Sequence, residues 1–184
     1  IGRLRRNARR QLALQQPFLD EWITTLKKNL PPYTKLSDIL RQELHDFIKI
    51  FLAEKSFEGC GGVDSTDEIR VTIAAQACLL LLNRKADCYP KLRTVLVYPS
   101  TYVDGGNGLF VDKSKRSVRL GESWNHGVVV LAWDSVKQGA INFKDGRNVA
   151  MHEFAHQLDQ EDGVADGAPI LEDRSAYGPW AEIF

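Results

Sequence analysis

Hydrophobic residues recur at helical spacing in two stretches near the start of the chain, residues 17–28 and 36–55. An apolar residue at every third or fourth position is typical of an amphipathic helix, so the pattern predicts two helices. The residues that follow this spacing are Trp22, Ile23, Leu26, Leu40, Leu44, Phe47, Ile48 and Phe51. Pro31 and Pro32 separate the helices, because proline cannot continue one, and Ser37 can cap the second.

A third predicted helix, residues 69–83, is apolar nearly all round and follows a polar helix start at residues 65–68. A helix without a polar face is buried inside its domain. We therefore expect it to pack behind a helix that carries functional residues.

Runs of β-branched residues predict strands at residues 94–98 and 127–133, and residues 117–120 are a further candidate. The glycine-rich residues 55–62 lack the Gly-Lys-Ser/Thr ending of a phosphate-binding loop, so they indicate a turn. Helices, a buried helix, strands and a last helix in this order predict an α+β fold with a small sheet.

Charge and cysteine content narrow the function classes. The 24 basic residues balance the 24 acidic ones, which gives no reason to expect direct nucleic-acid binding. Cys60, Cys78 and Cys88 are odd in number and lack the spacing of a disulfide framework or a cysteine zinc site. The sequence has no apolar run long enough to span a membrane, and its charged first residues lack the apolar stretch that is typical of a signal peptide. Together these features predict a cytoplasmic protein that does not associate with membranes.

The sequence His152-Glu153-Phe154-Ala155-His156 carries the clearest chemistry. Residues four apart lie on one face of a helix, so His152 and His156 can bind one zinc ion. Glu153 lies beside them and can act as the general base of a metallopeptidase. The motif predicts His152 and His156 as metal ligands, Glu153 as the catalytic residue and Zn²⁺ as the cofactor.

A catalytic zinc site usually has a third protein ligand, and the motif does not supply it. Asp162 stands six residues after His156, at the metzincin position, but the glycine expected at 159 is Asp159. Glu172 and Glu182 are the other acidic candidates of the gluzincin type, and a glutamate beyond Phe184 remains a further alternative.

Other polar and aromatic residues near the motif allow two interpretations each. Asp159 could support a ligand imidazole or belong to an ordinary helix surface. His126 could donate a hydrogen bond in a cleft or belong to a loop. His45 has no acidic or cysteine partner at ligand spacing, so we expect it to be structural or exposed. Trp124 and Trp133 could line the site or belong to the core.

Five blocks of sequence together resemble a known family. They are residues 66–68, 71–81, 121–124, 152–159 and 177–180. In these blocks the chain resembles the zinc-dependent peptidases of the Mlc titration factor A family, and the resemblance runs from about Trp22 to the last residue. It implies a bacterial, cytoplasmic, gluzincin-like peptidase.

The family resemblance also implies a fold, a ligand and a partner. The fold would be zincin-like and similar to the catalytic domain of anthrax lethal factor, with a small mixed sheet, an HExxH active-site helix and a buried backing helix. The third ligand would be a glutamate several tens of residues after His156, beyond Phe184. Residues 1–184 would then form a single zincin-like metallopeptidase domain without its C-terminal part. The partner would be the transcriptional repressor Mlc, which links the protein to the regulation of sugar uptake.

Two functions follow as hypotheses. The first is zinc-dependent hydrolysis of a peptide or protein substrate, with Glu153 as general base. The acidic residues between 153 and 182 favour a cationic amino terminus, and so an aminopeptidase, although such a run also suits a solvated surface. An extended peptide could pair with a strand edge at residues 128–133. The second function is a non-catalytic regulatory protein that sequesters a transcription factor, with the basic residues 2–10 available for docking.

Overall fold

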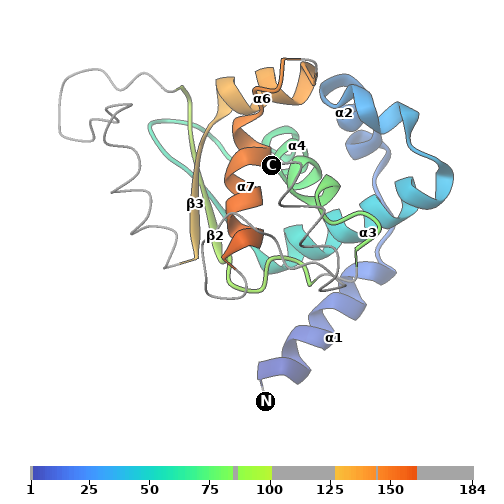
Figure 1. The fold of residues 1–184 in the computed structure, drawn as a ribbon. Helices are drawn as coiled ribbons and strands as arrows, with labels where there is room; N and C mark the ends of the chain where they lie inside the picture. Colours follow the sequence, from blue (N-terminus) through green and yellow to red (C-terminus); the bar gives the residue numbers. More distant parts are fainter. Residues whose placement is uncertain (1, 85–86, 101–126, 144, 161–184) are drawn as a thin grey trace, which may run out of the picture.

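The computed structural model describes residues 2–84, 87–100, 127–143 and 145–160, and Figure 1 shows how they are arranged. Helices dominate this part of the chain, and in Figure 1 they lie to one side of a small sheet. The elements are α1 (Gly2–Gln15), α2 (Asp20–Asn29), the 3₁₀ helix η1 (Pro31–Lys35), α3 (Asp38–Glu54), β1 (Ser56–Gly59), α4 (Asp67–Leu79), β2 (Thr94–Tyr98), β3 (Val128–Ala132), α6 (Trp133–Ile141) and α7 (Val149–Asp159).

The three strands of the described chain form one sheet in the order β1-β2-β3, and both pairs are parallel. The mixed sheet that we expected would need an antiparallel strand from outside the described residues, so it stays a prediction. Parallel neighbours need a crossover connection, and α4 supplies one between β1 and β2. The candidate strand at residues 117–120 lies outside the described residues.

The first strand was not predicted, because the glycine-rich residues 55–62 indicated a turn. Residues 56–59 form β1 instead, and Ser56 pairs with Thr94 while Gly59 pairs with Val97. Three of the four residues of β1 are exposed, so its sequence shows no alternation of apolar and polar positions. Its pairing with β2 therefore defines the strand.

The predicted helices near the start of the chain are confirmed as α2, α3 and α4. Ser37 caps α3 by accepting a hydrogen bond from the Leu40 amide, and Thr66 caps α4 in the same way through Ile69. Nine of the thirteen residues of α4 are buried, from Ile69 to Cys78 with Arg70 as the exception. The helix packs against α3, α6 and α7, which confirms the predicted buried helix behind the HExxH sequence.

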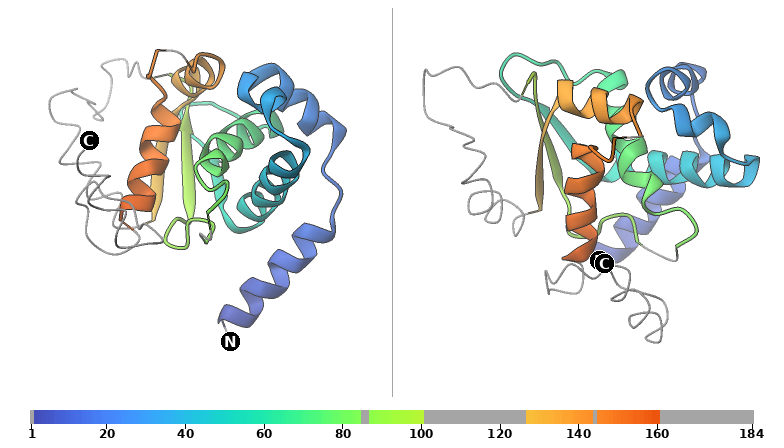
Figure 2. Two further views of the ribbon diagram at one scale, coloured as in Figure 1. Left: turned by 45° about the vertical axis from the view of Figure 1, so that its right-hand side comes forward. Right: turned by 45° about the horizontal axis from the view of Figure 1, so that its top comes forward.

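Two helices were missed by the sequence patterns. Helix α1 projects from the rest of the structure in Figures 1 and 2. Ion pairs and a hydrogen bond connect it to α3 and its surroundings. Arg10 pairs with Glu54 and Asp87, while the Lys49 ammonium donates to the Leu14 carbonyl oxygen at 3.0 Å. Helix α6 begins directly after β3, so Trp133, which we placed at the end of a strand, is its first residue.

Helix α7 is held by an aromatic cluster that consists of Phe51, Tyr89 and Phe154. The Phe154 ring has no exposed surface and lies 5.7 Å from the Phe51 ring and 5.3 Å from the Tyr89 ring, measured between centroids. Tyr89 is fixed in turn, because its hydroxyl donates to the Ala77 carbonyl oxygen at 2.7 Å. The cluster thereby connects α7 to α3 and α4.

A search of the described helices for a membrane span found none with the necessary length and apolar character.

Candidate metal centre

Helix α7 presents one polar face and one buried face. Ala150, Phe154 and Leu158 are buried, whereas His152 and His156 are exposed. The helix starts at a good cap, because Asn148 Oδ1 accepts a hydrogen bond from the Met151 amide at 2.9 Å. Burial of one face and a cap at the first turn hold the two histidines on a fixed scaffold.

The two imidazoles converge, as the helical spacing predicts. His152 Nε2 lies 3.1 Å from His156 Nε2, and the ring planes are nearly perpendicular, at 83°. Two nitrogens bound to one tetrahedral zinc at 2.0–2.1 Å would lie about 3.3 Å apart. The pair therefore fits a single zinc ion that both Nε2 atoms bind.

The protonation of His152 also suits a metal ligand. Partial burial of the imidazole, followed by the charge of His156, lowers the pKa of His152 below its ordinary value. A lowered pKa keeps the imidazole neutral to lower pH, and only a neutral imidazole has the lone pair that a metal needs.

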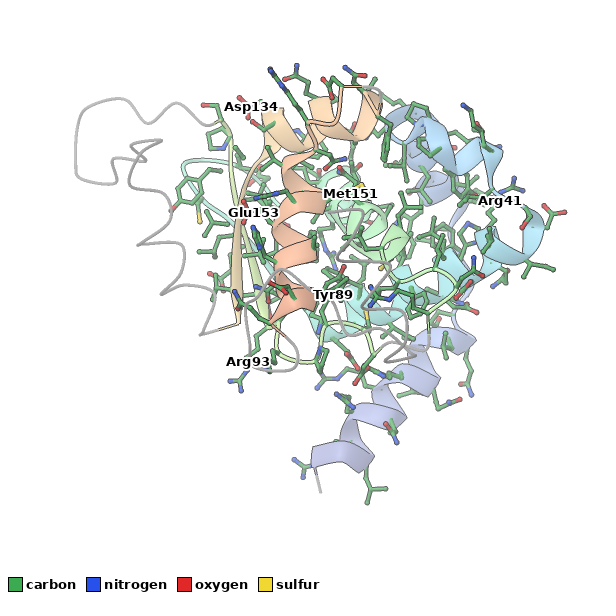
Figure 3. The ribbon with its side chains drawn as sticks, in the orientation of Figure 1. Arg41, Tyr89, Arg93, Asp134, Met151 and Glu153 are labelled. Atoms are coloured by element: carbon green, nitrogen blue, oxygen red, sulfur yellow. The ribbon has the colours of Figure 1, made fainter. Side chains whose placement is uncertain are left out.

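Glu153 lies between the two histidines in sequence but on a different side of the helix. Figure 3 labels it on the side of α7 that faces the sheet, and its side chain is half-buried. Helix α7 packs against β3, so the sheet lies close to this side of the helix. This placement suits a base that acts next to the metal position.

No third metal ligand accompanies the two histidines in the described ranges, where no group of three His, Cys, Asp or Glu side chains could hold a metal ion. The candidates Asp162, Glu172 and Glu182 lie outside the described residues. His126 and Trp124 also lie outside them, so their roles stay predictions.

Asp159 and His45 are placed by the structure. Asp159 is only 8% exposed, so the interpretation as ordinary helix surface is wrong, and its Oδ1 forms no hydrogen bond within the described part of the chain. His45 is structural, as predicted: its Nε2 lies 2.9 Å from the Tyr33 hydroxyl, and its ring stacks on Phe18. Trp133 is partly buried and packs against the core, which fits its interpretation as a core residue.

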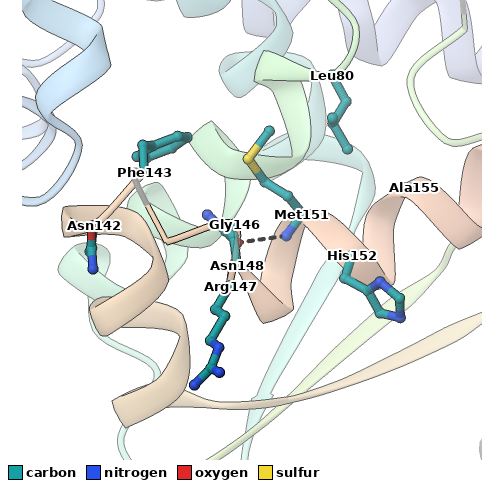
Figure 4. Close-up of a pocket in the computed structure, with 9 residues that line it drawn as sticks. All are labelled: Leu80, Asn142, Phe143, Gly146, Arg147, Asn148, Met151, His152 and Ala155. Atoms are coloured by element: carbon teal, nitrogen blue, oxygen red, sulfur yellow. Dashed lines mark hydrogen bonds between the residues drawn. The ribbon is translucent and has the colours of Figure 1, made fainter. Parts of the chain in front are cut away.

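Sequence reasoning missed a pocket beside His152. It has a volume of about 380 Å³ and is formed by the end of α4, the connection between α6 and α7, and one side of α7 (Figure 4). The lining residues are Leu80, Asn142, Phe143, Gly146, Arg147, Asn148, Met151, His152 and Ala155. Asn148 could have been found from the sequence, because it directly precedes an apolar helical pattern and so reads as a cap.

Comparisons with known proteins identify relatives of the chain. A protein of Synechocystis described as uncharacterised is 41% identical over 181 residues, which are 96% of this chain and 66% of that protein. Mlc titration factor A of Klebsiella pneumoniae is 28% identical over 153 residues, 81% of this chain and 57% of its own length. Mlc titration factor A of Yersinia pestis is 29% identical over 161 residues, 85% of this chain and 58% of its own length.

The chain thus spans between 57% and 66% of the length of these relatives. The sequence profile of the family described as glucose-regulated metallo-peptidase M90 matches residues 4–184, which is nearly the whole chain. The chain therefore belongs to the glucose-regulated metallo-peptidase M90 family.

Proposed function

We propose that the protein of which this chain is part is a zinc-dependent peptidase, in which His152 and His156 bind the metal and Glu153 is the general base. One observation carries the proposal: the two Nε2 atoms lie 3.1 Å apart on one helix, with a glutamate directly after the first histidine. Membership of a metallopeptidase family supports it.

His152, His156 and Glu153 have different roles in the proposed reaction. A zinc ion, when bound, would act as a Lewis acid that polarises the peptide carbonyl and makes water a better nucleophile. The imidazoles of His152 and His156 would hold it through their Nε2 atoms. The Glu153 carboxylate accepts the proton of the attacking water and returns it to the leaving amine.

The third ligand is part of the same proposal. In a gluzincin-like site it is a glutamate, and we place it beyond Phe184, on the family resemblance. Asp162, Glu172 and Glu182 stay open as alternatives, since they lie outside the described residues. A zincin-like domain over residues 1–184, a likeness to the lethal factor catalytic domain and a cytoplasmic location stay predictions.

The substrate is proposed to be an extended peptide that pairs with the sheet edge at β3. Support comes from the strand order, in which β3 is terminal among the described strands, and from the contact between β3 and α7. Main-chain hydrogen bonds at such an edge would hold the peptide next to Glu153. An aminopeptidase preference rests on the acidic sequence that follows α7.

The test is Glu153→Gln in the full-length protein. Glutamine keeps the size of the side chain but cannot accept the proton, so we expect kcat to fall by about 10²- to 10⁴-fold while zinc content stays at the wild-type level. His152→Ala is the matched comparison, because it should lose zinc as well as activity. Normal peptide cleavage by the glutamine variant would show that Glu153 is not the base.

The name of the Klebsiella and Yersinia relatives favours a second candidate function. As a titration factor for Mlc, the protein would bind a transcriptional repressor and need no catalysis. Partner binding that survives His152→Ala and His156→Ala, in a protein that cleaves no peptide, would favour this function over the first.

A further inference from the structure

The pocket beside His152 has an apolar end. Leu80 from the end of α4, Phe143 from the α6–α7 connection, and Met151 and Ala155 from α7 all contribute to its wall. In Figure 4 the Met151 side chain extends between Phe143 and Leu80. Phe143 is 37% exposed and Ala155 is exposed, so apolar surface lies open to a ligand here.

The same pocket adjoins one of the two proposed metal ligands. His152 lines it, and the Nε2 atom of His152 is one of the two nitrogens that converge at 3.1 Å. A group bound in the pocket would therefore lie beside His152. A peptide whose scissile bond is at the metal has its neighbouring side chains within reach of this pocket.

The charge in the pocket wall is positive. Arg147 lines the pocket and is exposed, whereas the Asn148 side chain is used by the cap of α7 and by the Gly139 carbonyl oxygen at 3.0 Å. A guanidinium at the rim repels lysine and arginine side chains but not apolar ones.

We propose that this pocket is a specificity site that takes an apolar side chain of the substrate next to the scissile bond, and that Arg147 at its rim excludes basic side chains. The inference rests on the proposed peptidase function, because that function brings the peptide to His152. Leucine, methionine and phenylalanine are the side chains that match an apolar wall of this composition, in a pocket of about 380 Å³.

Cleavage of a peptide panel tests the specificity. The panel has Gly, Leu, Phe or Lys at one position beside the scissile bond and is cleaved by the full-length protein. Filling an apolar pocket is worth about tenfold or more in kcat/KM, so we expect the Leu and Phe peptides to exceed the Gly peptide by at least that factor. The Lys peptide should be the poorest substrate of the four.

The variant Ala155→Leu fills the pocket from its own wall and should reduce the ratio of Leu to Gly cleavage to near one. Ala8→Leu is the matched control, because Ala8 is also an exposed alanine on a helix but lies on α1, away from the pocket. Arg147→Glu should raise cleavage of the Lys peptide relative to the Gly peptide. An unchanged ratio in Ala155→Leu would overturn the proposal.

A binding measurement separates the pocket from the catalytic proposal. N-acetyl-leucinamide should shift the backbone NMR signals of Gly146, Met151 and Ala155 in this chain, N-acetyl-glycinamide should not, and Ala155→Leu should abolish the shifts. Binding without cleavage would support the pocket and refute the peptidase function. Cleavage without binding or side-chain preference would support the peptidase function and refute the pocket as a specificity site. Shifts that depend on protein concentration alone would show that a second copy fills the pocket, which would also overturn the proposal.

Discussion

Replacing Phe154 by alanine tests whether the aromatic cluster, rather than the histidine motif, keeps α7 in place. The Phe154 ring is fully buried and contacts both Phe51 and Tyr89, whose rings also contact each other. Alanine would remove the ring and leave a cavity that these neighbours can fill only in part. Such a change typically costs about 3–5 kcal/mol in the free energy of unfolding.

A loss of about 3–5 kcal/mol should lower the melting temperature by roughly 6–20 °C in a chain of this size, at about 2–4 °C per kcal/mol. Far-ultraviolet circular dichroism measures the transition. Phe143→Ala is the matched control, because it makes the same change at a side chain that is 37% exposed. We expect that control to cost about 1 kcal/mol or less. If both variants lower the melting temperature equally, the aromatic cluster does not support α7 in the way the structure indicates.

Two further predictions concern the cap of α7 and acid stability. Asn148→Ala removes the acceptor for the Met151 amide and should lower the free energy of unfolding by about 1–2 kcal/mol, measured in urea titrations. Asn148→Asp keeps the acceptor and should therefore lose less stability. Equal losses in the two variants would contradict a capping role. Burial lowers the pKa of His45 in the folded chain. Below about pH 6.5 the unfolded chain therefore binds a proton at His45 more readily than the folded chain does. The free energy of unfolding that is present above this pH is lost as the pH falls. Urea midpoints at about pH 7.5 and about pH 5.5 should show a smaller acid loss for His45→Gln than for the wild type, and parallel losses would show that another group is responsible.

Local patterns predicted the helices well, and their limits have a physical cause. The spacing around Leu44 and Ile48 predicted α3, and the apolar run after Thr66 predicted α4, because burial of a helix face leaves a periodic signal. Helix α1 buries no such apolar face, because Leu4 and Leu12 are exposed. It is rich in arginine, and Arg6 and Arg10 attach it to acidic groups that are distant in sequence.

Strand pairing was harder to predict than strand position. The runs of β-branched residues predicted the positions of β2 and β3. Neither run predicts which strand β2 or β3 pairs with, or whether the pairing is parallel or antiparallel. The four residues of β1 become a strand only because Phe57 pairs with Val95 and its neighbours follow. The parallel direction follows from the crossover through α4, which is a property of the whole fold.

The candidate site combines a local feature with a tertiary one. His152 and His156 are related by helical geometry alone, so the sequence predicted a convergence that the structure shows at 3.1 Å. The pocket beside them depends on the fold, because Leu80 comes from the end of α4 and Phe143 from the connection after α6. No helical or strand periodicity relates these two residues to α7. Only the packing of α4 and α6 against α7 brings them to His152.

The packing behind α7 orients the residues of the histidine motif. An isolated helix of eleven residues is marginal in water, so His152 and His156 would not stay at ligand distance by helical spacing alone. Phe154 lies within the motif, and its burial against Phe51 and Tyr89 fixes the rotation of α7 about its axis. That rotation turns both imidazoles outward and keeps Glu153 on the side of the sheet. The apolar residue inside the motif therefore orients its three polar residues, and a zinc site at this position depends on α3 and on the turn that carries Tyr89 as much as on the ligands themselves.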